Sequence, residues 1–307
     1  MEKPETSNKG ESRKCVIDVR DLYKIYPIGK NEVRALNGVS FQVYEGEFCA
    51  IVGTSGSGKS TLLNMLAGLE KPTKGQIMVA GERIDKYKEN RLVQFRREKV
   101  GFIFQSFNLI PTMNAVENVA LPLVFRGISK NVRMKRAQKM IDLVGLKKYR
   151  LHKPNQMSGG QQQRVGMARA LVLNPSIVFA DEPTGNLDSN TSAEMMELMR
   201  HVLSERGKTL VMVTHDRYFL DKVSNRILEI SRGNMYGYDA NYSRFLELKA
   251  EREEMELASE RKRQSILRME LEWAKRGCRA RTTKQRARLN RLEDLKQGKA
   301  PVSDAVV

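Results

Sequence analysis

The sequence lacks long hydrophobic runs. No segment approaches the roughly 20 predominantly apolar residues that a transmembrane helix needs. Met1 is followed by polar and charged residues, whereas a secretory signal has an apolar region near its start. We therefore expect the chain neither to span a membrane nor to enter a secretory route by its own sequence. Any membrane role would then depend on a partner.

Cysteine and histidine are also scarce. The 307 residues include three of each. Cys15, Cys49 and Cys278 lie far apart and form no CxxC pair. Disulfide frameworks and thiolate or imidazole metal sites require these residues in clusters. We expect reduced thiols, with neither a disulfide framework nor a metal site of this kind.

Basic residues outnumber acidic ones, and the excess of positive charge is unevenly distributed along the chain. The chain has 54 Lys and Arg against 36 Asp and Glu, which gives a formal net charge of +18. Residues 261–300 hold fourteen basic and four acidic residues, a net charge of +10. Such an asymmetry is typical of a segment that faces a polyanion. A solvated, charged helix is the alternative interpretation.

The pattern of apolar residues predicts an α/β domain over residues 15–240, preceded by a polar and disordered N-terminus, 1–14. Short β-type runs alternate with helical stretches, and this alternation favours a largely parallel sheet with helices on both faces. The β-type runs are residues 15–19, 39–43, 48–53, 100–104, 176–180 and 210–213; the helical stretches are 59–67, 130–144, 161–172 and 189–205.

Beyond this domain, residues 241–298 predict a basic helical hairpin, followed by a tail, 299–307. The chain has no proline between this point and Pro301. If residues 241–275 are helical throughout, they extend about 50 Å. A break at residues 276–278 separates them from a second helical stretch, 283–297. Because apolar residues are sparse in both stretches, we expect a thin seam between two antiparallel helices.

A glycine-rich loop is the strongest functional signal. Residues 53–61, GTSGSGKST, match GxxxxGK[ST] and lie between an apolar strand and a helix, the context that this motif requires. Backbone N–H groups in such a loop surround phosphates, Lys59 adds a positive charge, and the Ser60 hydroxyl can bind Mg²⁺. The predicted ATP-binding residues in this loop are Gly53, Ser55, Gly56, Ser57, Gly58, Lys59, Ser60 and Thr61.

Two adjacent carboxylates end a second apolar strand, in the sequence IVFADE. Ligands of open α/β sheets gather at the carboxyl ends of their strands. Asp181 is expected to hold Mg²⁺, and Glu182 to act as the general base that polarises the attacking water. Together with the glycine-rich loop, this pair predicts a nucleoside triphosphatase whose cofactors are ATP and Mg²⁺.

With these two motifs, further sequence elements resemble the ABC ATPases and stand in that family's order. They are Tyr26, Gln105 in FIFQ, the signature Ser158, Gly159, Gly160 and Gln161 in MSGGQ, Asp188 in GNLD, and His215 in VTHD. The resemblance implies a P-loop NTPase core with helical and antiparallel β subdomains. It also implies a homodimer, because this family completes each site with the signature of a second subunit.

The resemblance further implies a role for each of these residues. Tyr26 would stack on adenine, Gln105 would reach the metal ion and the lytic water, and His215 would contact the γ-phosphate. The signature residues would bind the γ-phosphate of the opposite subunit, and Asp188 would lie at the subunit junction. A groove near Gln105, lined by residues 106–122, would receive short helices of a permease.

Two branches of the family are similar to different parts of the chain. Residues 15–216 resemble the ATPase subunits of lipoprotein-releasing and macrolide-export transporters. The resemblance rests on segments such as GFIFQSFNLIPTMNAVENVALPL. This resemblance implies a separate transmembrane permease and a peripheral place at the cytoplasmic face of a membrane.

Residues 217–300 resemble instead the inter-cassette linker of the ABC-F translation factors and resistance proteins. That resemblance implies a ribosome-associated ATPase with a truncated or hybrid chain. Its hairpin tip would contact RNA through Lys275, Arg276, Arg279, Arg281 and Lys284. We favour the transporter subunit over this alternative because a larger part of the chain supports it. An inactive chain whose arm blocks the permease is a third possibility.

Overall fold

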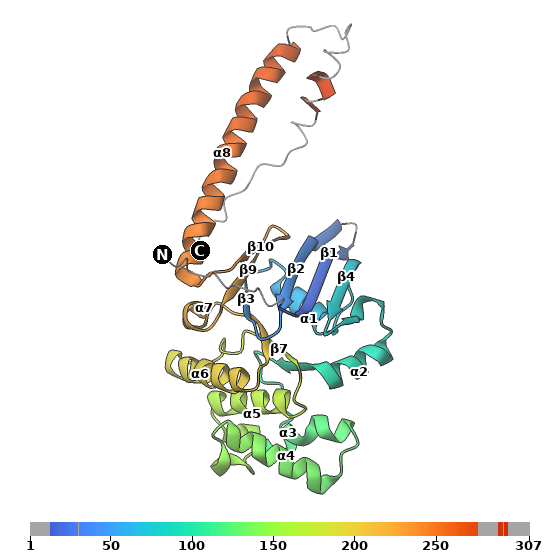
Figure 1. The fold of residues 1–307 in the computed structure, drawn as a ribbon, viewed down its shortest axis with the longest axis vertical. Helices are drawn as coiled ribbons and strands as arrows, with labels where there is room; N and C mark the ends of the chain where they lie inside the picture. Colours follow the sequence, from blue (N-terminus) through green and yellow to red (C-terminus); the bar gives the residue numbers. More distant parts are fainter. Residues whose placement is uncertain (1–12, 30, 276–287, 291, 294–307) are drawn as a thin grey trace, which may run out of the picture. The chain divides into compact units, whose positions relative to one another are not determined.

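A computed structural model describes residues 13–29, 31–275, 288–290 and 292–293 (Figure 1). The chain divides into two compact units, residues 1–242 and 243–307. No helix among the described residues has the length and apolar character that crossing a membrane requires.

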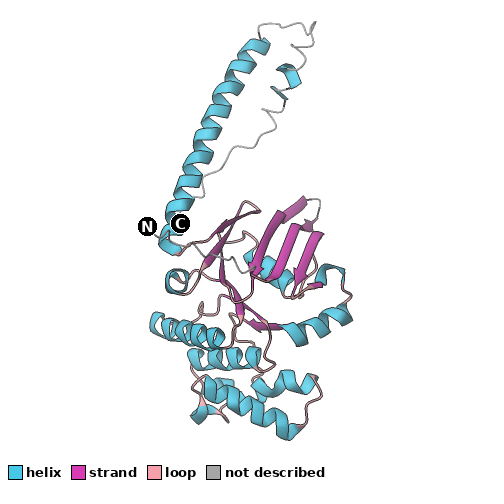
Figure 2. Cartoon of the chain, viewed as in Figure 1, coloured by secondary structure: helices cyan, strands magenta, loops and turns pink. Residues whose placement is uncertain are grey.

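A six-stranded sheet forms the centre of the first unit, with the strand order β10-β9-β3-β8-β7-β6 (Figures 1 and 2). Five of these strands run parallel, and β10 pairs antiparallel with β9. Every residue of β3 and β8 is buried, as expected for continuous apolar runs inside a parallel sheet. The strands are β3 (Phe48–Val52), β6 (Val100–Ile103), β7 (Ile177–Asp181), β8 (Thr209–Val213), β9 (Arg226–Ser231) and β10 (Asn234–Tyr238).

A second, antiparallel sheet has the order β2-β1-β4-β5. Its strands are β1 (Cys15–Ile28), β2 (Asn31–Tyr44), β4 (Lys74–Val79) and β5 (Glu82–Arg83). Helix α1 (Lys59–Leu66) shares one apolar core with both sheets: Leu62 and Leu66 belong to the same buried cluster as Val19 of β1 and Phe179 of β7. The two sheets and the helix that follows the glycine-rich loop therefore stabilise one another.

Three helices, α3 (Ala115–Phe125), α4 (Lys130–Leu143) and α5 (Gly159–Leu171), pack together as a helical group. Asn114 begins α3 through a capping box with Glu117, and Asn118 ties α3 to the preceding loop by accepting from the Ile110 N–H at 2.7 Å. The other helices of this unit are α2 (Glu89–Lys99), α6 (Ser189–Glu205) and α7 (Arg217–Lys222), with three short 3₁₀ turns at Ile84–Lys86, Lys147–Tyr149 and Pro154–Gln156.

This architecture is the predicted α/β fold with an antiparallel β subdomain and a helical subdomain. Each predicted strand and helix of residues 15–213 lies where a structural element is found. The sequence patterns did not reveal β4, β9, β10, α2 or α3 as separate elements. Of these, β4 has an exposed face and α2 carries many charges, so neither produces a strong apolar run.

Helix α8 (Tyr242–Lys275) begins at the last residue of the first unit, and the rest of it belongs to the second unit. Ion pairs along α8 join residues three or four apart, such as Arg244 with Glu247 at 2.6 Å and Arg263 with Glu260 at 2.7 Å. Arg288 donates to Glu270 at 2.5 Å, and its guanidinium lies 4.1 Å from the centre of the Trp273 ring, so Arg288 lies beside the C-terminal part of α8. The predicted tip residues Arg276, Arg279, Arg281 and Lys284 lie outside the described residues, as does the side chain of Lys275.

Candidate functional site

The glycine-rich loop connects β3 to α1, and its glycines allow a path that other residues would obstruct. Gly53, Gly56 and Gly58 have φ angles of 150°, 75° and 97°. A Cβ atom on Gly53 would lie 2.4 Å from the carbonyl oxygen of Ile230, and one on Gly58 would lie 2.6 Å from that of Ala35. The loop is therefore closed in by β9 and β2, and these two positions require glycine.

Lys59, the first residue of α1, points back into the loop. Its Nζ donates hydrogen bonds to the carbonyl oxygens of Gly53 at 2.8 Å and Thr54 at 2.9 Å. Burial lowers the pKa of this ammonium group, while the nearby carboxylates of Glu182 and Asp181 oppose the shift. This buried positive charge, which forms no ion pair with the part of the chain that the structure describes, is held beside the N-terminus of a helix, and this suits it to bind a polyphosphate.

The next residue of α1 meets the end of β7. The Ser60 hydroxyl donates to Oδ1 of Asp181 at 3.1 Å. Burial raises the pKa of Asp181, and the hydrogen bond from Ser60 partly opposes this rise. A hydroxyl and a carboxylate are hard oxygen donors of the kind that Mg²⁺ prefers, and a divalent cation here would relieve the cost of the buried charge.

Glu182 follows directly, in a left-handed backbone conformation with φ of 41°. Its N–H donates to the carbonyl oxygen of Val213 at 2.9 Å, so the end of β8 fixes this strained residue. Oε1 of Glu182 lies 3.9 Å from Nε2 of His215, which belongs to the loop after β8. A carboxylate and an imidazole are thereby held side by side beyond the carboxyl ends of two neighbouring strands.

Lys59, Ser60, Glu182 and His215 line a cavity of about 410 Å³. Its lining residues are Tyr26, Val33, Arg34, Ala35, Ser55, Gly56, Gly58, Lys59, Ser60, Thr61, Glu182 and His215. Of the predicted ATP-binding and catalytic residues, the structure thus brings together most of the loop with Tyr26, Glu182 and His215. Gly53, Ser57 and the predicted metal ligand Asp181 are not among the lining residues. The volume is within the range of small-molecule sites.

Tyr26 lies in the cavity wall with its ring held from one side. Its hydroxyl donates to Oε1 of Glu70 at 2.7 Å, and Nζ of Lys24 lies 4.9 Å from the ring centre. Burial raises the pKa of the Tyr26 hydroxyl. These contacts fix the plane of an aromatic ring at the cavity, as stacking on a base requires.

Sequence reasoning missed Val33, Arg34 and Ala35 in the cavity wall. They lie on β2, and Tyr26 of β1 pairs directly with Val33 in the antiparallel register. No motif marks these residues. The only available signal was that a strand hairpin follows Tyr26, which would have placed its partner strand beside the same site.

The four signature residues do not line this cavity. Ser158 precedes α5 and forms a capping box with Gln161: the Gln161 N–H donates to Oγ of Ser158 at 3.3 Å, and the Ser158 N–H donates to Oε1 of Gln161 at 3.0 Å. Gly160 is closed in by α6, because a Cβ atom there would lie 2.4 Å from the Thr191 methyl group. The chain therefore presents a well-formed helix N-terminus away from its own lysine loop.

Gln105 and Asp188 also lie outside the cavity lining. The Gln105 amide nitrogen lies beside Gly185, 2.8 Å from where a Cβ atom would be, and the Gln105 carbonyl accepts a hydrogen bond from the Asn186 side chain at 3.0 Å. Asp188 begins α6 and accepts from the Thr191 hydroxyl at 2.6 Å and N–H at 3.0 Å, which lowers the pKa of Asp188. The hydrogen bond between Asn186 and the backbone carbonyl of Gln105 thus links the loop after β7 to the loop after β6.

A separate groove of about 230 Å³ lies between α2, β6, α3 and α5. It is lined by Arg96, Arg97, Val100, Gly101, Phe102, Leu121, Pro122, Phe125, Arg169, Ala170 and Leu173. Of the stretch 106–122 that was expected to form a docking groove, Leu121 and Pro122 contribute. Phe125, which is 58% exposed, adds an aromatic surface next to the Arg97 guanidinium.

Comparison with known proteins relates both parts of the chain to one family. A family model described as "ABC transporter" matches residues 36–185, and a second model with the same description matches residues 228–306. The first match contains the glycine-rich loop, the signature and the paired carboxylates.

Relatives and a solved structure agree with the family models. An uncharacterized ABC transporter ATP-binding protein of Thermotoga maritima is 49% identical over 226 residues, which are 74% of this chain and 96% of that protein. The macrolide export ATP-binding/permease protein MacB of Hyphomonas neptunium is 42% identical over 74% of this chain, which spans 35% of that longer protein. The dimeric, post-hydrolysis structure of the cassette MJ0796 bound to ADP and Pi has a TM-score of 0.66 at 41% identity, covering 73% of this chain and 98% of that one.

Proposed function

The chain belongs to the family of ABC transporter ATP-binding proteins, and from this premise we propose that it hydrolyses ATP to drive a separate transmembrane permease. The observation that carries the proposal is the cavity in which Lys59, Ser60, Glu182 and His215 meet. Lys59 and Ser60 lie on α1, and Glu182 and His215 lie just beyond β7 and β8, so the rigid centre of the fold holds the reacting groups in place.

Each residue of the cavity has a task in this reaction. The loop N–H groups and Lys59 bind the β- and γ-phosphates, and the ring of Tyr26 stacks on the base. Ser60, Asp181 and Gln105 are the candidates to hold Mg²⁺, which would neutralise charge on the phosphates. Glu182 accepts a proton from the attacking water while the water oxygen bonds to the γ-phosphorus. The bond between that phosphorus and the β,γ-bridging oxygen breaks, and ADP leaves with the bridging oxygen. His215 donates a hydrogen bond to a γ-phosphate oxygen.

The complete site requires two copies of the chain. Ser158, Gly159, Gly160 and Gln161 lie at a capped helix N-terminus outside the cavity lining of their own chain, which leaves them available to the γ-phosphate of a partner. Asp188, at the start of α6, would lie at the junction of the two subunits. The dimeric assembly of the related MJ0796 cassette supports this arrangement.

The permease would dock in the groove beside Phe125. Its lining combines apolar side chains with three arginines, so it suits a short amphipathic helix with acidic residues. The loop after β6 leads from this groove to Gln105, which provides a path from the permease to the site. A cassette bound in this way would lie at the cytoplasmic face of a membrane.

The general base can be tested by the substitution Glu182→Gln. We expect ATP turnover to fall by about 10²- to 10⁴-fold while ATP binding persists, because the amide cannot take the proton. The variant should therefore accumulate as an ATP-bound dimer in size-exclusion chromatography. Undiminished turnover would remove Glu182 from this role.

Shared sites can be tested by mixing two inactive variants, Lys59→Ala and Ser158→Arg. Each homodimer has two damaged sites. A mixed dimer has one intact site, formed by the lysine loop of the Ser158→Arg chain and the signature of the Lys59→Ala chain. Random pairing of equal amounts makes about half of the dimers mixed, each with one of its two sites intact. We therefore expect the mixture to recover up to about a quarter of the ATPase activity of wild-type protein at the same total concentration. No recovery, despite mixed dimers being detected, would contradict a shared site.

For the C-terminal part, we propose the finer division into a cassette, 15–240, and a helical hairpin, 241–298. The contact of Arg288 with Glu270 supports a chain that turns back along α8. The comparisons lend no support to a ribosome-bound ATPase, and the relatives favour the transporter. Co-sedimentation with ribosomes that depends on Arg279 and Arg281 would favour the alternative.

A further inference from the structure

Residues 126–153 carry a second concentration of positive charge, which the nucleotide site does not use. This stretch holds ten basic residues and one acid, Asp142, for a net charge of +9. Residues 261–300 carry +10 of the total of +18, so the remainder of the chain has a net charge of −1. Positive charge in this protein is therefore local, and one of its two locations is the helical subdomain.

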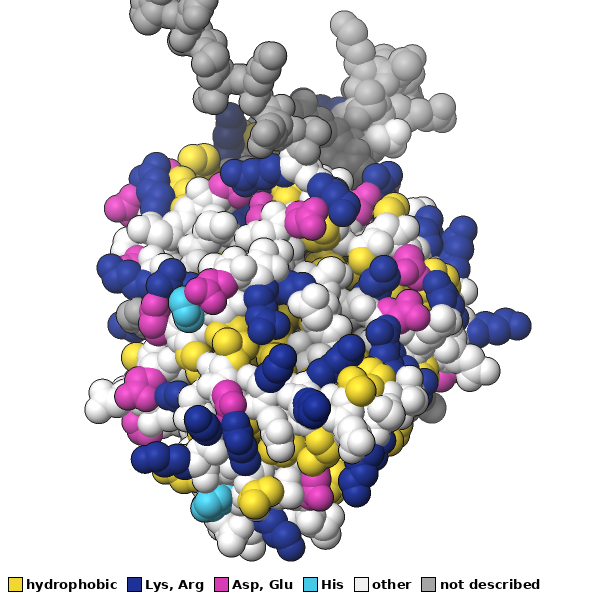
Figure 3. Space-filling view, turned by 60° about the horizontal axis from the view of Figure 1, so that its bottom comes forward, with side chains coloured by type: hydrophobic (Ala, Val, Ile, Leu, Met, Phe, Trp, Pro, Cys, Tyr) yellow, Lys and Arg dark blue, Asp and Glu magenta, His cyan; other side chains and the backbone are white. Residues whose placement is uncertain are grey.

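The basic side chains of this stretch lie on the outside of α4 and on the segments directly before and after it. The inner side of α4 is formed by Ala137, Met140 and Ile141, which are buried. Figure 3 shows this end of the molecule, where Lys and Arg side chains gather around yellow apolar ones. The exposed cations are Arg126, Lys130, Lys135, Arg136, Lys139, Lys147, Lys148 and Lys153.

Most of this charge has no acidic partner. Within residues 126–153, all of which the structure describes, Arg150 with Asp142 forms the one ion pair. Arg133 donates to the backbone oxygen of Ile128 at 3.2 Å. The exposed lysines repel one another, and few acidic side chains lie among them to reduce this repulsion. An anionic surface that covers the face would therefore lower its electrostatic free energy.

Large apolar side chains are exposed among these lysines. Leu151 is 78% exposed and Val132 is 43% exposed, while Phe125 lies at the edge of the stretch. A nucleic acid would attract the lysines and could stack on an aromatic ring, but it offers little to aliphatic side chains. The interfacial layer of an anionic bilayer accepts both kinds of group, since lysine heads reach phosphates while aliphatic groups enter the acyl boundary.

We propose that the face formed by residues 126–153 binds the headgroups of anionic phospholipids, with Val132 and Leu151 entering the interfacial layer. Its neighbour along the chain is Phe125, in the groove assigned to the permease. A cassette docked there would hold the adjoining face near the bilayer, and for this placement alone the inference rests on the proposed function. The bilayer would then add to the affinity of the cassette for its permease.

Vesicle binding by the full chain tests the proposal without a permease. The triple variant Lys130→Gln, Lys135→Gln, Lys139→Gln is compared with Lys74→Gln, Lys86→Gln, Lys88→Gln, which loses the same charge from the antiparallel sheet and its vicinity. On phosphatidylglycerol vesicles at low salt, we expect the first variant to lose at least tenfold in affinity, because each lysine near an anionic bilayer contributes about a fivefold factor. The control should bind nearly as the wild type does, and neither protein should bind phosphatidylcholine vesicles.

The basic C-terminal segment could itself bind anions, so both triple variants are also made in a background with Arg279→Gln, Arg281→Gln and Lys284→Gln. Equal affinity of the two triple variants in both backgrounds would overturn the proposal. Leu151→Ser separates lipid from RNA: we expect it to weaken vesicle binding and to leave binding to single-stranded RNA unchanged. RNA binding that depends on Lys130, Lys135 and Lys139 and exceeds vesicle binding would also overturn it. ATPase activity should stay unchanged in all these variants, so a failure here would not count against the proposed function.

Discussion

Arg169 of α5 holds Phe107 and its neighbour by their backbone carbonyl groups. Its guanidinium donates to the Phe107 oxygen at 2.8 Å and to the Asn108 oxygen at 2.5 Å. Phe107 and Asn108 are both left-handed, with φ of 58° and 50°, a conformation that costs free energy for residues with a side chain. The same helix begins at the signature Ser158, and a Cβ atom on Gly159 would lie 3.6 Å from the Phe107 ring. One arginine thus links the loop after Gln105 to the signature.

Replacing Arg169 with lysine should loosen this loop. An ammonium group cannot reproduce the fork that holds two carbonyl oxygens at once, so at least one hydrogen bond is lost from a charged donor, at about 1.5–3 kcal/mol. We expect faster amide hydrogen exchange in residues 105–108 and lower ATP turnover in an otherwise folded cassette. Arg164→Lys is the matched control, because Arg164 lies on the same helix and pairs with the exposed Glu194. Equal exchange in both variants would show that the clamp is unimportant.

Two glycines of the phosphate-binding loop should respond differently to alanine. Gly58→Ala places a Cβ atom 2.6 Å from the Ala35 oxygen, whereas nothing lies within 4 Å of a Cβ atom on Gly56. Both residues have positive φ, so Gly56→Ala should cost about 1–2 kcal/mol from the backbone conformation alone. Gly58→Ala must also shift β2 or the start of α1, and we expect it to abolish ATP binding. Fluorescent-nucleotide titration and urea unfolding measure the two effects.

Much of the fold and the lysine loop could be predicted from the sequence, because both depend on local patterns. Runs such as residues 48–52 and 210–213 are apolar throughout, as expected of strands that are buried on both faces. The glycine-rich motif at residues 53–61 directly follows a strand and runs into a helix, so the whole signal lies within one short segment of the sequence. In these places local sequence and final structure coincide.

Other features depend on contacts between distant segments, and no local pattern encodes them. Arg34 enters the cavity because its strand pairs with that of Tyr26, and Arg169 reaches a loop some 60 residues earlier in the chain. The sequence pattern did not predict the basic face, because its charges are spread over a helix and the segments beside it. The charges of residues 261–300, in contrast, form one dense run. A charged surface depends on where its side chains lie in the folded chain, and a low density of charge along the sequence can conceal it.

Asp181 makes the ligand-free protein sensitive to pH. Burial raises the pKa of its carboxyl group above the unfolded value, so the folded state binds the proton more tightly. The free energy of unfolding therefore falls as the pH rises through the unfolded and then the folded pKa, and the cost of the buried charge is present in full above the folded pKa. Without Mg²⁺, Asp181→Asn should be more stable than wild type at pH 8, with a smaller difference at pH 4. Thermal melts at the two pH values measure this gap, and a gap that widens toward acid would contradict the assignment.

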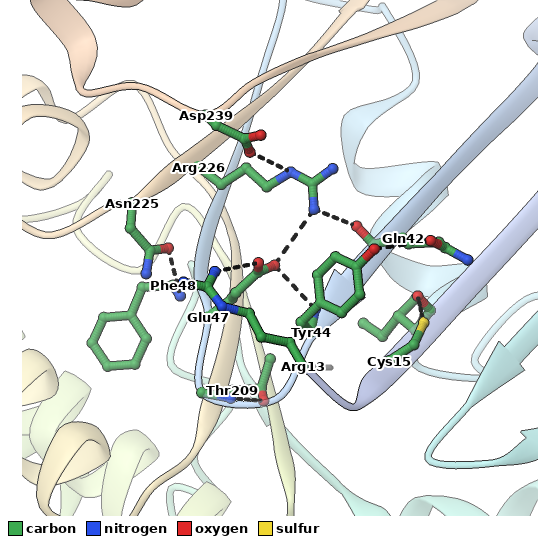
Figure 4. A network of polar contacts seen from close by, with 12 residues as sticks. Arg13, Cys15, Gln42, Tyr44, Glu47, Phe48, Thr209, Asn225, Arg226 and Asp239 are labelled. Atoms are coloured by element: carbon green, nitrogen blue, oxygen red, sulfur yellow. Dashed lines mark hydrogen bonds and ion pairs between the residues drawn. The ribbon is translucent and has the colours of Figure 1, made fainter. Parts of the chain in front are cut away.

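A buried ion pair should stabilise the amino-terminal ends of β3 and β9, at the end of the central sheet opposite the nucleotide site. Glu47 is 7% exposed, and Figure 4 shows it facing Arg226, which also reaches Asp239 at 3.2 Å and donates to the Gln42 carbonyl at 2.8 Å. Arg226→Met leaves the Glu47 carboxylate with the Tyr44 N–H and the more distant, exposed Arg13. We expect the free energy of unfolding to fall by about 3 kcal/mol, since the remaining charge stays buried.

The double variant Glu47→Gln, Arg226→Met separates the loss of a favourable contact from the cost of an unpaired charge. If the unpaired carboxylate causes most of the instability, neutralising it should restore a large part of the free energy of unfolding, measured by urea denaturation. The single variant Glu47→Gln should cost less than Arg226→Met, because Arg226 keeps Asp239 and the Gln42 carbonyl as partners. If the changes in the free energy of unfolding of the two single variants simply add in the double variant, the charges at Glu47 and Arg226 do not interact. The stability of this end of the sheet then depends on apolar packing instead.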